Sequence, residues 1–364
     1  MSERPRPRDV GLRLLGTPGE RNAITDVPGV RVGHATLIRG EGPRVRGSGP
    51  VRTGVTVVLP RPAGDFRAVF AATAVLNGTG ELTGAHAVAE TGLLYGPIAL
   101  TNSNGVGIVR DTLVRWLADN DPRFSAAMPV VGETWDGRLN DIDGFHVAAE
   151  HVADAIAGAS GDDLAGGAVG AGTGTIAYGL KGGIGTASRR VGDHVIGALV
   201  QSNQGSADQL VVDGVPVGRE LLAPQASTER FEAGSIVMLL ATDAPLLPDQ
   251  LERLARRAAL GLARTGSTSG PFSGDFAVAF STAEAPPGDF VAQVDLAAPP
   301  RVMAVRTVTG SDLAPLLRAA VEAVEEAVLD SLFRATTMRG ADDLVVPALD
   351  VDAVARLLGA HGRL

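Results

Sequence analysis

The stretch TGSTSGPFSG (residues 265–274), which continues into DFAVAFST (275–282), decides how the fold of this chain is interpreted. The preceding segment 248–264 carries apolar residues at helical spacing, and 275–282 is a short apolar run of the kind that forms a strand. The turn-rich residues between them predict a loop that joins a helix to a strand. The next strand-like segment, 301–308, follows a proline-rich stretch at 285–300 rather than a helix. Sheet layers flanked by helices fit this order better than a doubly wound sheet.

The same two patterns recur along the rest of the chain. Short β-branched or apolar runs predict four more strands, several of them buried on both faces, and apolar residues at every third or fourth position predict three more helices. No internal repeat or low-complexity linker divides the chain, so we expect a single domain over residues 1–364. The further strands are expected at 29–38, 54–60, 194–202 and 235–242, and the further helices at 109–119, 147–158 and 312–334.

Composition excludes several classes of function. The 364 residues are 45% hydrophobic and 20% charged, as in globular proteins, and carry a net charge of −9. Lys181 is the only lysine and the arginines are scattered, so we expect no nucleic-acid partner. The chain has no cysteine, which excludes a thiolate nucleophile. No apolar run has the length of a signal peptide or a membrane span, so we expect a soluble cytoplasmic protein with no membrane contact.

Taken one at a time, the polar motifs have ordinary structural interpretations. Ser273 at the start of a strand and Asn203 in an Asn-Gln-Gly sequence after a strand are typical of turns, and Glu133 could be a surface glutamate. The glycine-rich stretch 166–185 contains GAGTG but lacks the strand, helix and Lys-Ser pair of a phosphate-binding loop. We therefore interpret its glycines as sites of close packing.

Several long motifs, in collinear order over nearly the whole chain, resemble the family of L-aminopeptidase/D-esterases and β-peptidyl aminopeptidases. The resemblance implies an α+β fold, an αββα sandwich of the N-terminal-nucleophile hydrolase type. It also implies a precursor that cuts itself between Phe272 and Ser273, giving an α chain of residues 1–272 and a β chain of residues 273–364. The motifs include LNGTGELTG (76–84), GPIALTNSNGVGIVRD (96–111), VVGETWDG (130–137), LVQSNQG (199–205) and FSGDFAVAFSTA (272–283).

The resemblance also implies roles for individual residues. Ser273 would be the nucleophile, and once it is N-terminal its own α-amine can take the hydroxyl proton, so no histidine is required. Asn203 would help to stabilise the oxyanion, and Glu133 would hold the free ammonium group of the substrate. The family spacing places a further catalytic serine at Ser311, but the glutamate expected two positions later is Leu313 in this chain.

Two departures from the family pattern bear on activity. Trp135 stands where active relatives have a tyrosine, and an indole has no acidic hydroxyl for a proton relay. Phe272 precedes the cleavage point, where the family more often has Gly or Asn.

Three functions stay open on the sequence. The first is an aminopeptidase that acts on small peptides, amides or esters. The second is an acyltransferase similar to ornithine acetyltransferase, and the third is a binding protein that kept the fold and lost its processing. No metal or cofactor is implied, and the resemblance implies a homo-oligomer for which a tetramer is plausible.

Overall fold

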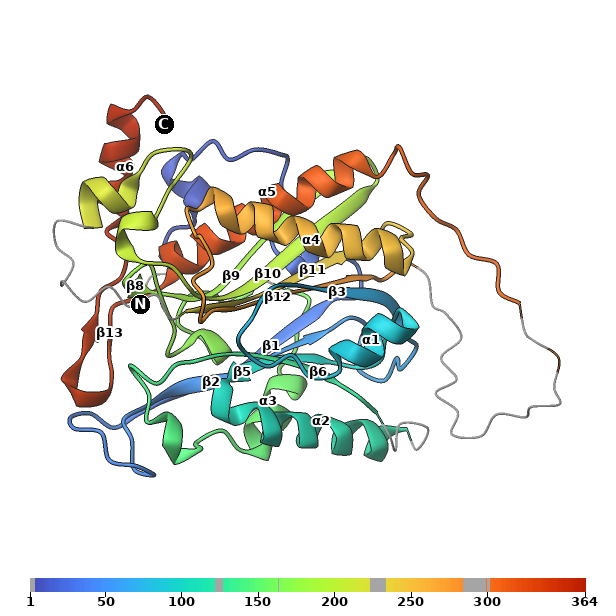
Figure 1. The fold of residues 1–364 in the computed structure, drawn as a ribbon, viewed down its shortest axis with the longest axis horizontal. Coiled ribbons are helices and arrows are strands. Elements are labelled where there is room, and N and C mark those ends of the chain that lie inside the picture. The colour runs from blue at the N-terminus through green and yellow to red at the C-terminus, as the bar shows by residue number, and fades with distance from the viewer. Residues whose placement is uncertain (1–3, 122–126, 163, 223–233, 284–298, 300–301) are drawn as a thin grey trace.

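The structure is a computed structural model that describes residues 4–121, 127–162, 164–222, 234–283, 299 and 302–364. Two sheets lie face to face between two layers of helices (Figure 1). The layered arrangement predicted from the sequence is therefore confirmed.

The larger sheet has six strands in the order β4-β3-β12-β11-β10-β9. The neighbours β11 and β12 are parallel, and the other pairs in this sheet are antiparallel. Its strands are β3 (Val69–Gly78), β4 (Leu93–Leu94), β9 (Gly183–Val191), β10 (His194–Asn203), β11 (Ser235–Thr242) and β12 (Gly274–Ser281).

The smaller sheet has four strands in the order β1-β2-β5-β6, with β5 and β6 parallel. Every residue of β2, β11 and β12 is buried, which confirms the prediction of strands covered on both faces. The strands of this sheet are β1 (Arg31–Arg39), β2 (Val51–Leu59), β5 (Ile98–Asn102) and β6 (Val130–Thr134).

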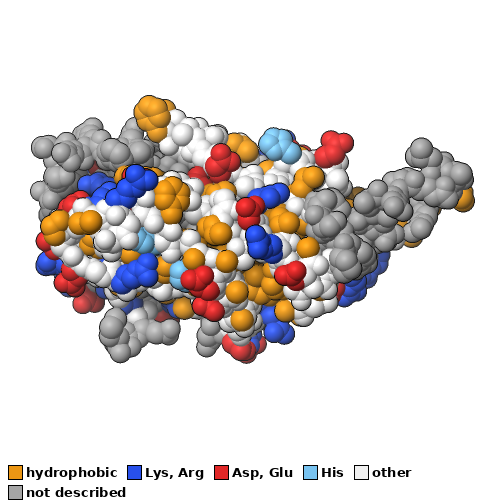
Figure 2. All heavy atoms as spheres, turned by 90° about the horizontal axis from the view of Figure 1, so that it is seen from below, with side chains coloured by type: hydrophobic (Ala, Val, Ile, Leu, Met, Phe, Trp, Pro, Cys, Tyr) orange, Lys and Arg blue, Asp and Glu red, His pale blue; other side chains and the backbone are white. Residues whose placement is uncertain are grey.

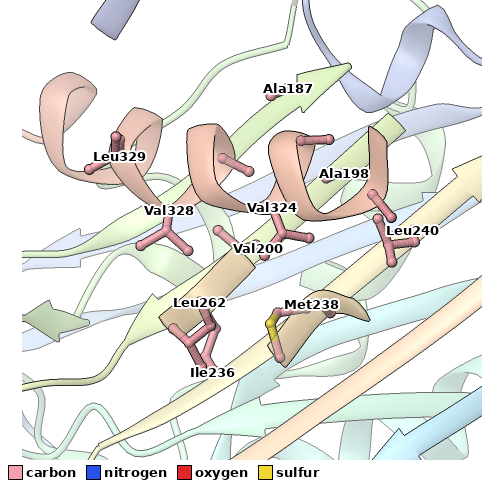
Figure 3. Close-up of a cluster of buried hydrophobic side chains, with 14 of the residues drawn as sticks. Ala187, Ala198, Val200, Ile236, Met238, Leu240, Leu262, Val324, Val328 and Leu329 are labelled. Atoms are coloured by element: carbon pink, nitrogen blue, oxygen red, sulfur yellow. The ribbon is translucent and has the colours of Figure 1, made fainter. Parts of the chain in front are cut away.

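Four long helices form the outer layers. Helices α4 (Pro248–Arg264) and α5 (Ala314–Arg334) cover the six-stranded sheet, while α2 (Val106–Asn120) and α3 (Ala149–Ala157) cover the four-stranded sheet (Figure 1). All four were predicted from apolar spacing, and α4 has the predicted bounds. Figure 3 shows the core beneath the upper layer, where Val324 and Val328 of α5 lie over Ala198 and Val200 of β10. This packing fixes α5 against the sheet that carries β12.

Short elements complete the fold. Helix α1 (Ala85–Thr91) follows β3, and α6 (Val351–Ala360) lies near the C-terminus. Two small hairpin pairs, β7 (Ile176–Ala177) with β8 (Leu180–Lys181) and β13 (Met338–Arg339) with β14 (Val345–Val346), lie outside the main sheets. The first of these pairs places Lys181 inside the molecule, where its side chain is fully buried.

The prediction of a strand at 301–308 is wrong. Residue 301 lies outside the described residues, and 302–309 form no strand. Strand β12, which precedes this segment, already has β3 on one side and β11 on the other, so it offers no free edge for pairing. The apolar side chains that suggested a strand, Val302, Met303 and Val305, are exposed instead.

One face of the molecule shows how charged and apolar side chains are distributed. The face that carries α2 and α3 shows acidic, basic and hydrophobic side chains interspersed (Figure 2). Among the described residues, no helix has the length and apolarity required to cross a membrane.

Candidate active site

Ser273 lies where a tight turn enters β12. Its N–H donates to the carbonyl of Gly270 at 2.9 Å, and its own carbonyl accepts from Thr79 N–H at 3.2 Å. Ser273 is 2% exposed, whereas Phe272, the residue before it, is 71% exposed. The peptide bond between them therefore marks the point where an exposed loop becomes a buried strand.

The hydroxyl of Ser273 has a buried acceptor. Its Oγ donates to Oδ1 of Asp275 at 2.6 Å. Asp275 is 1% exposed, and its burial raises the pKa of the carboxyl above its ordinary value, which the hydrogen bond from Ser273 opposes. The sequence interpretation did not single out Asp275, although a residue two positions along a strand shares the face of Ser273.

Asn203 is at the same edge of the six-stranded sheet as Ser273. The register pairs Asn203 with Ser235 on β11, and Ser235 in turn with Gly274 on β12. Two strand spacings separate Asn203 from Gly274, roughly 10 Å. The Asn203 carboxamide is held at both ends, since Oδ1 accepts from Ile176 N–H at 2.8 Å and Nδ2 donates to the Trp135 carbonyl at 3.0 Å.

Glu133 reaches the site from the other sheet. It lies in β6 and is 4% exposed, with Oε1 accepting from Glu81 N–H at 3.0 Å and Oε2 accepting from the hydroxyl of Ser103. Burial raises the pKa of Glu133, and these two hydrogen bonds oppose the shift. Among the described residues no cationic side chain forms an ion pair with Glu133. The site therefore holds a buried carboxylate that has hydrogen-bond donors but no positive partner.

Gly80, in the loop after β3, lies close to both sheets at this point. A Cβ atom on Gly80 would lie 2.7 Å from Oε1 of Glu133 and 3.5 Å from Cα of Gly274. A side chain at this position would have to displace the Glu133 carboxylate. The loop after β3 thus lies between the Glu133 carboxylate and the start of β12 and is in close contact with both.

An open cavity of about 490 Å³ is lined by several of the predicted site residues. Glu133, Trp135 and Phe272 share its wall, and the indole of Trp135 is 40% exposed. Ser273 borders a separate cavity of about 10 Å³, and Gly234 borders both. The other residues that line the larger cavity are Thr79, Gly80, Glu81, Ser103 and Ser235.

The structure does not bring Ser311 to this cluster. Ser311 is exposed in the turn before α5. Val308, three residues earlier, donates its N–H to the carbonyl of Pro245 at 3.0 Å, just beyond the C-terminal end of β11. Ser273 lies at the opposite end of the parallel pair β11 and β12, about 25 Å away for strands of this length.

Lys181, the single lysine of the chain, supports the site from inside the molecule. Its Nζ donates to the carbonyls of Gly172, Thr175 and Gly182 at 2.8 to 2.9 Å. Burial lowers the pKa of Lys181 to about 7, an effect that the carboxylate of Asp136 opposes. The ammonium therefore holds the loop of residues 172–175 in place. Ile176, which follows this loop, donates its N–H to Oδ1 of Asn203 and so orients the carboxamide.

The glycines of 166–185 pack closely, as predicted. A Cβ on Gly172 would lie 2.4 Å from Ile184 N, and one on Gly183 would lie 2.2 Å from the carbonyl oxygen of Gly167. Close backbone approach of this kind leaves no space for side chains. These glycines let the loop fold tightly behind Asn203.

Comparison with known proteins gives a consistent result. Residues 22–346 match the model of peptidase family S58. The chain is 45% identical over 377 aligned residues to beta-peptidyl aminopeptidase BapA of Sphingosinicella xenopeptidilytica, an alignment that covers 98% of this chain and 92% of the relative.

Solved structures agree with the sequence match. A beta-aminopeptidase of Burkholderia sp. superposes with a TM-score of 0.89 at 43% identity, covering 98% of this chain and 99% of the other. The L-aminopeptidase D-Ala-esterase/amidase of Ochrobactrum anthropi, described as a variant of the Ntn hydrolase fold, superposes with a TM-score of 0.89 at 41% identity, covering 99% of each chain. The expected αββα fold of N-terminal-nucleophile type is thereby confirmed.

Proposed function

The chain belongs to peptidase family S58 and is a serine-type aminopeptidase, and we propose that it makes its own nucleophile by cutting the bond between Phe272 and Ser273. The observation that carries this proposal is the position of that bond. Phe272 lies in the wall of the cavity that also holds Glu133, while Ser273 is fixed as the first residue before β12. A cut at this bond would leave a new N-terminus beside a cavity with a buried carboxylate.

The freed α-amine of Ser273 supplies the base for turnover. A free α-amine has a pKa near ~8 and can accept the proton of its own hydroxyl as that oxygen attacks the substrate carbonyl. The acyl group passes to Ser273 Oγ, the amine or alcohol leaves, and water then hydrolyses the ester. Asn203 Nδ2, about two strands away, is the proposed donor to the tetrahedral oxyanion.

Glu133 is the proposed site for the free N-terminus of the substrate. A substrate ammonium would give this buried carboxylate the positive partner it otherwise lacks, and an acylated amine would not. Trp135 forms part of the same wall, so we expect small first residues to be preferred. Short peptides, amides or esters with a free amine, including β-aminoacyl substrates, are the proposed substrate class.

The two chains left by the cut, residues 1–272 and 273–364, are proposed to stay together as one domain. Strand β12 lies between β3 and β11, and helix α5 packs on β9 and β10. After cleavage the shorter chain would still supply β12, an interior strand of the large sheet, and α5, one of the two helices that cover it. Separation would expose most of that core to water.

We also propose a homo-oligomer. Val302, Met303 and Val305 are exposed on a segment that leaves the body of the molecule before α5 (Figure 1). Exposed apolar side chains of this kind are typical of contact surfaces between copies. Light scattering coupled to gel filtration gives the number of copies, which we expect to be four, and a monomer at micromolar concentration would contradict the proposal. A cytoplasmic location stays a prediction of the sequence.

Denaturing electrophoresis with intact-mass measurement tests the cut. The purified protein should resolve into two chains, and Edman sequencing of the smaller one should read Ser-Gly-Asp-Phe. Ser273→Ala should remain a single chain and lose turnover, because it has no hydroxyl to attack either Phe272 or a substrate. A fully active protein that stays in one piece would overturn the proposal.

A further inference from the structure

We propose that Asp275 is the base that takes the Ser273 hydroxyl proton during self-cleavage. This inference rests on the proposed cut at Phe272 and concerns a step that precedes the mature enzyme. In the intact chain the nitrogen of Ser273 is an amide that donates to the Gly270 carbonyl. An amide nitrogen cannot act as the base that the free α-amine becomes later, so the precursor requires a different proton acceptor.

The hydrogen bond between Ser273 and Asp275 has the geometry of that acceptor. Oγ and Oδ1 are 2.6 Å apart, and both side chains are almost completely buried. Asp275 shares the strand face of Ala277 and Ala279, which belong to the core beneath the helices, whereas Val278 belongs to the core between the sheets. The carboxylate is therefore held under α4, directly beside the hydroxyl it would deprotonate.

Asp275 has fewer close hydrogen bonds than a structural aspartate such as Asp26. Among the described residues, its Oδ2 is buried without a hydrogen-bond partner. Asp26 provides the contrast, because it accepts from the Ser188 hydroxyl at 2.6 Å and also from the backbone N–H groups of Arg21 and Ala23. A buried carboxylate with an unsatisfied oxygen gains from taking up a proton, which is the property a general base requires.

The surroundings of Asp275 keep it basic. Arg256 of α4 lines the cavity of about 90 Å³ next to Asp275, but its guanidinium forms an ion pair with Glu252. Tyr178, a second titratable group near Asp275, is a neutral phenol at physiological pH, and burial raises its pKa further, to about 12. Among the described residues no cation forms an ion pair with Asp275. Burial raises the pKa of Asp275, and the hydrogen bonds from Ser273, Ser269 and the Ile236 backbone offset this shift only in part.

The proposed step balances as an acyl shift followed by hydrolysis. Ser273 Oγ attacks the carbonyl carbon of Phe272 while its proton moves to Asp275. The bond from that carbon to the Ser273 nitrogen breaks, and the nitrogen takes the proton back from Asp275. The resulting ester is hydrolysed by water, which leaves a carboxylate on Phe272, a free hydroxyl on Ser273 and a free α-amine.

Asp275→Asn is the direct test, because it keeps the shape and an acceptor oxygen but removes the basicity. Freshly translated or refolded precursor is followed by electrophoresis, and we expect the half-time of cleavage to lengthen about 10²-fold or more, the usual range for loss of a general base. Asp162→Asn is the matched control. Asp162 also accepts from a serine two residues earlier, Ser160, at 2.7 Å, but it is exposed and distant in sequence from β12.

Two further measurements separate a base from a structural role. Hydroxylamine cleaves an ester but does not replace the base in the acyl shift, so it should not rescue Asp275→Asn. Asp275→Glu, which restores a carboxylate, should recover part of the cleavage rate. The wild-type rate should rise with pH as Asp275 ionises, in a range above the ordinary aspartate pKa, and the residual rate of Asp275→Asn should lack this rise.

Each outcome has a distinct meaning. If wild type itself stays intact, the proposed cut fails and Asp275 has no such role. If wild type is cut and Asp275→Asn is cut at the same rate, the cut stands and the role of Asp275 is overturned. Rescue of Asp275→Asn by hydroxylamine would likewise overturn it, because the acyl shift would then proceed without the carboxylate.

Discussion

Buried carboxylates occur in two regions of this molecule, and the two regions differ in whether those carboxylates have arginine partners. Beneath α5, Glu326 is fully buried but accepts from Arg8, Arg189 and Asn22. Burial opposes ionisation of Glu326, yet the two guanidiniums hold the pKa of Glu326 below its ordinary value. At the edge of the sheets, Glu133 and Asp275 are also buried but form no ion pair with any cation in the described part of the chain, and burial raises the pKa of each.

The difference separates charges that hold the fold from charges that are available for chemistry. A buried carboxylate with two arginine partners is already neutralised and gains nothing from a ligand. A buried carboxylate without a cation gains from an ammonium or from a proton, which are the two species that the proposed reactions bring to Glu133 and to Asp275. Removing a charge should therefore affect stability in the first region and activity in the second.

The largest effect is expected on stability, from breaking the buried ion pair between Arg189 and Glu326. Arg189→Met should lower the free energy of unfolding by about 3–5 kcal/mol, because Glu326 would lose a guanidinium at 2.6 Å and remain buried with less compensation. Chemical denaturation measures this change. The double variant Arg189→Met with Glu326→Leu should recover most of the loss, and an unchanged midpoint in the single variant would show that the pair does not hold the fold.

A smaller energetic effect, confined to activity, is expected at the unpaired carboxylate. Glu133→Gln should lower kcat/KM for substrates with a free amine by about 10²-fold, as expected for loss of a buried charge partner worth ~3 kcal/mol. Its unfolding midpoint should change little, because no ion pair is broken. Aminoacyl p-nitroanilides with free and with acetylated amines are the matched substrates. Equal kcat/KM for the two, or for wild type and Glu133→Gln, would show that Glu133 does not bind the amine.

The smallest effect is a change in the slope of the pH profile. Glu133 must be ionised to bind an ammonium, so protonation at low pH removes binding. Because burial raises its pKa, this loss should begin above the ordinary glutamate value of 4.5. Below pH ~8 the α-amine of Ser273 already gives log kcat/KM a slope of one, and protonation of Glu133 should add a second unit at lower pH. Glu133→Gln should keep the first slope and lose the second.

Local patterns were sufficient for much of the fold. The apolar spacing of α4 and α5 and the short apolar runs of β10, β11 and β12 depend on residues that are neighbours in sequence, and their elements lie where predicted. The segment 301–308 shows the limit of such patterns. Its composition is that of a strand, but pairing requires an edge, and both edges of β12 are occupied.

The same limit applies to the site. The resemblance assigned Ser273, Asn203, Glu133 and Trp135 to one site. The structure places them near one edge of the two sheets, and their roles stay predictions. The resemblance also assigned Ser311 to this site, by counting residues through a segment of which 284–298 and 300–301 lie outside the described residues. The structure puts Ser311 beyond the other end of the strand, because a fixed spacing in sequence does not fix a position in space once a connecting segment intervenes.

The sequence by itself determined the chemistry that is possible and the local elements that carry it. Without cysteine the nucleophile had to be a hydroxyl, and the loop and strand around Ser273 could be identified from neighbouring residues. Only the tertiary structure decided which buried carboxylates form no ion pair with the residues it describes, and that Lys181 is enclosed by backbone carbonyls. Burial and pairing depend on segments that are distant in the chain, such as β6 and the loop after β3, and become neighbours only when the sheets pack together.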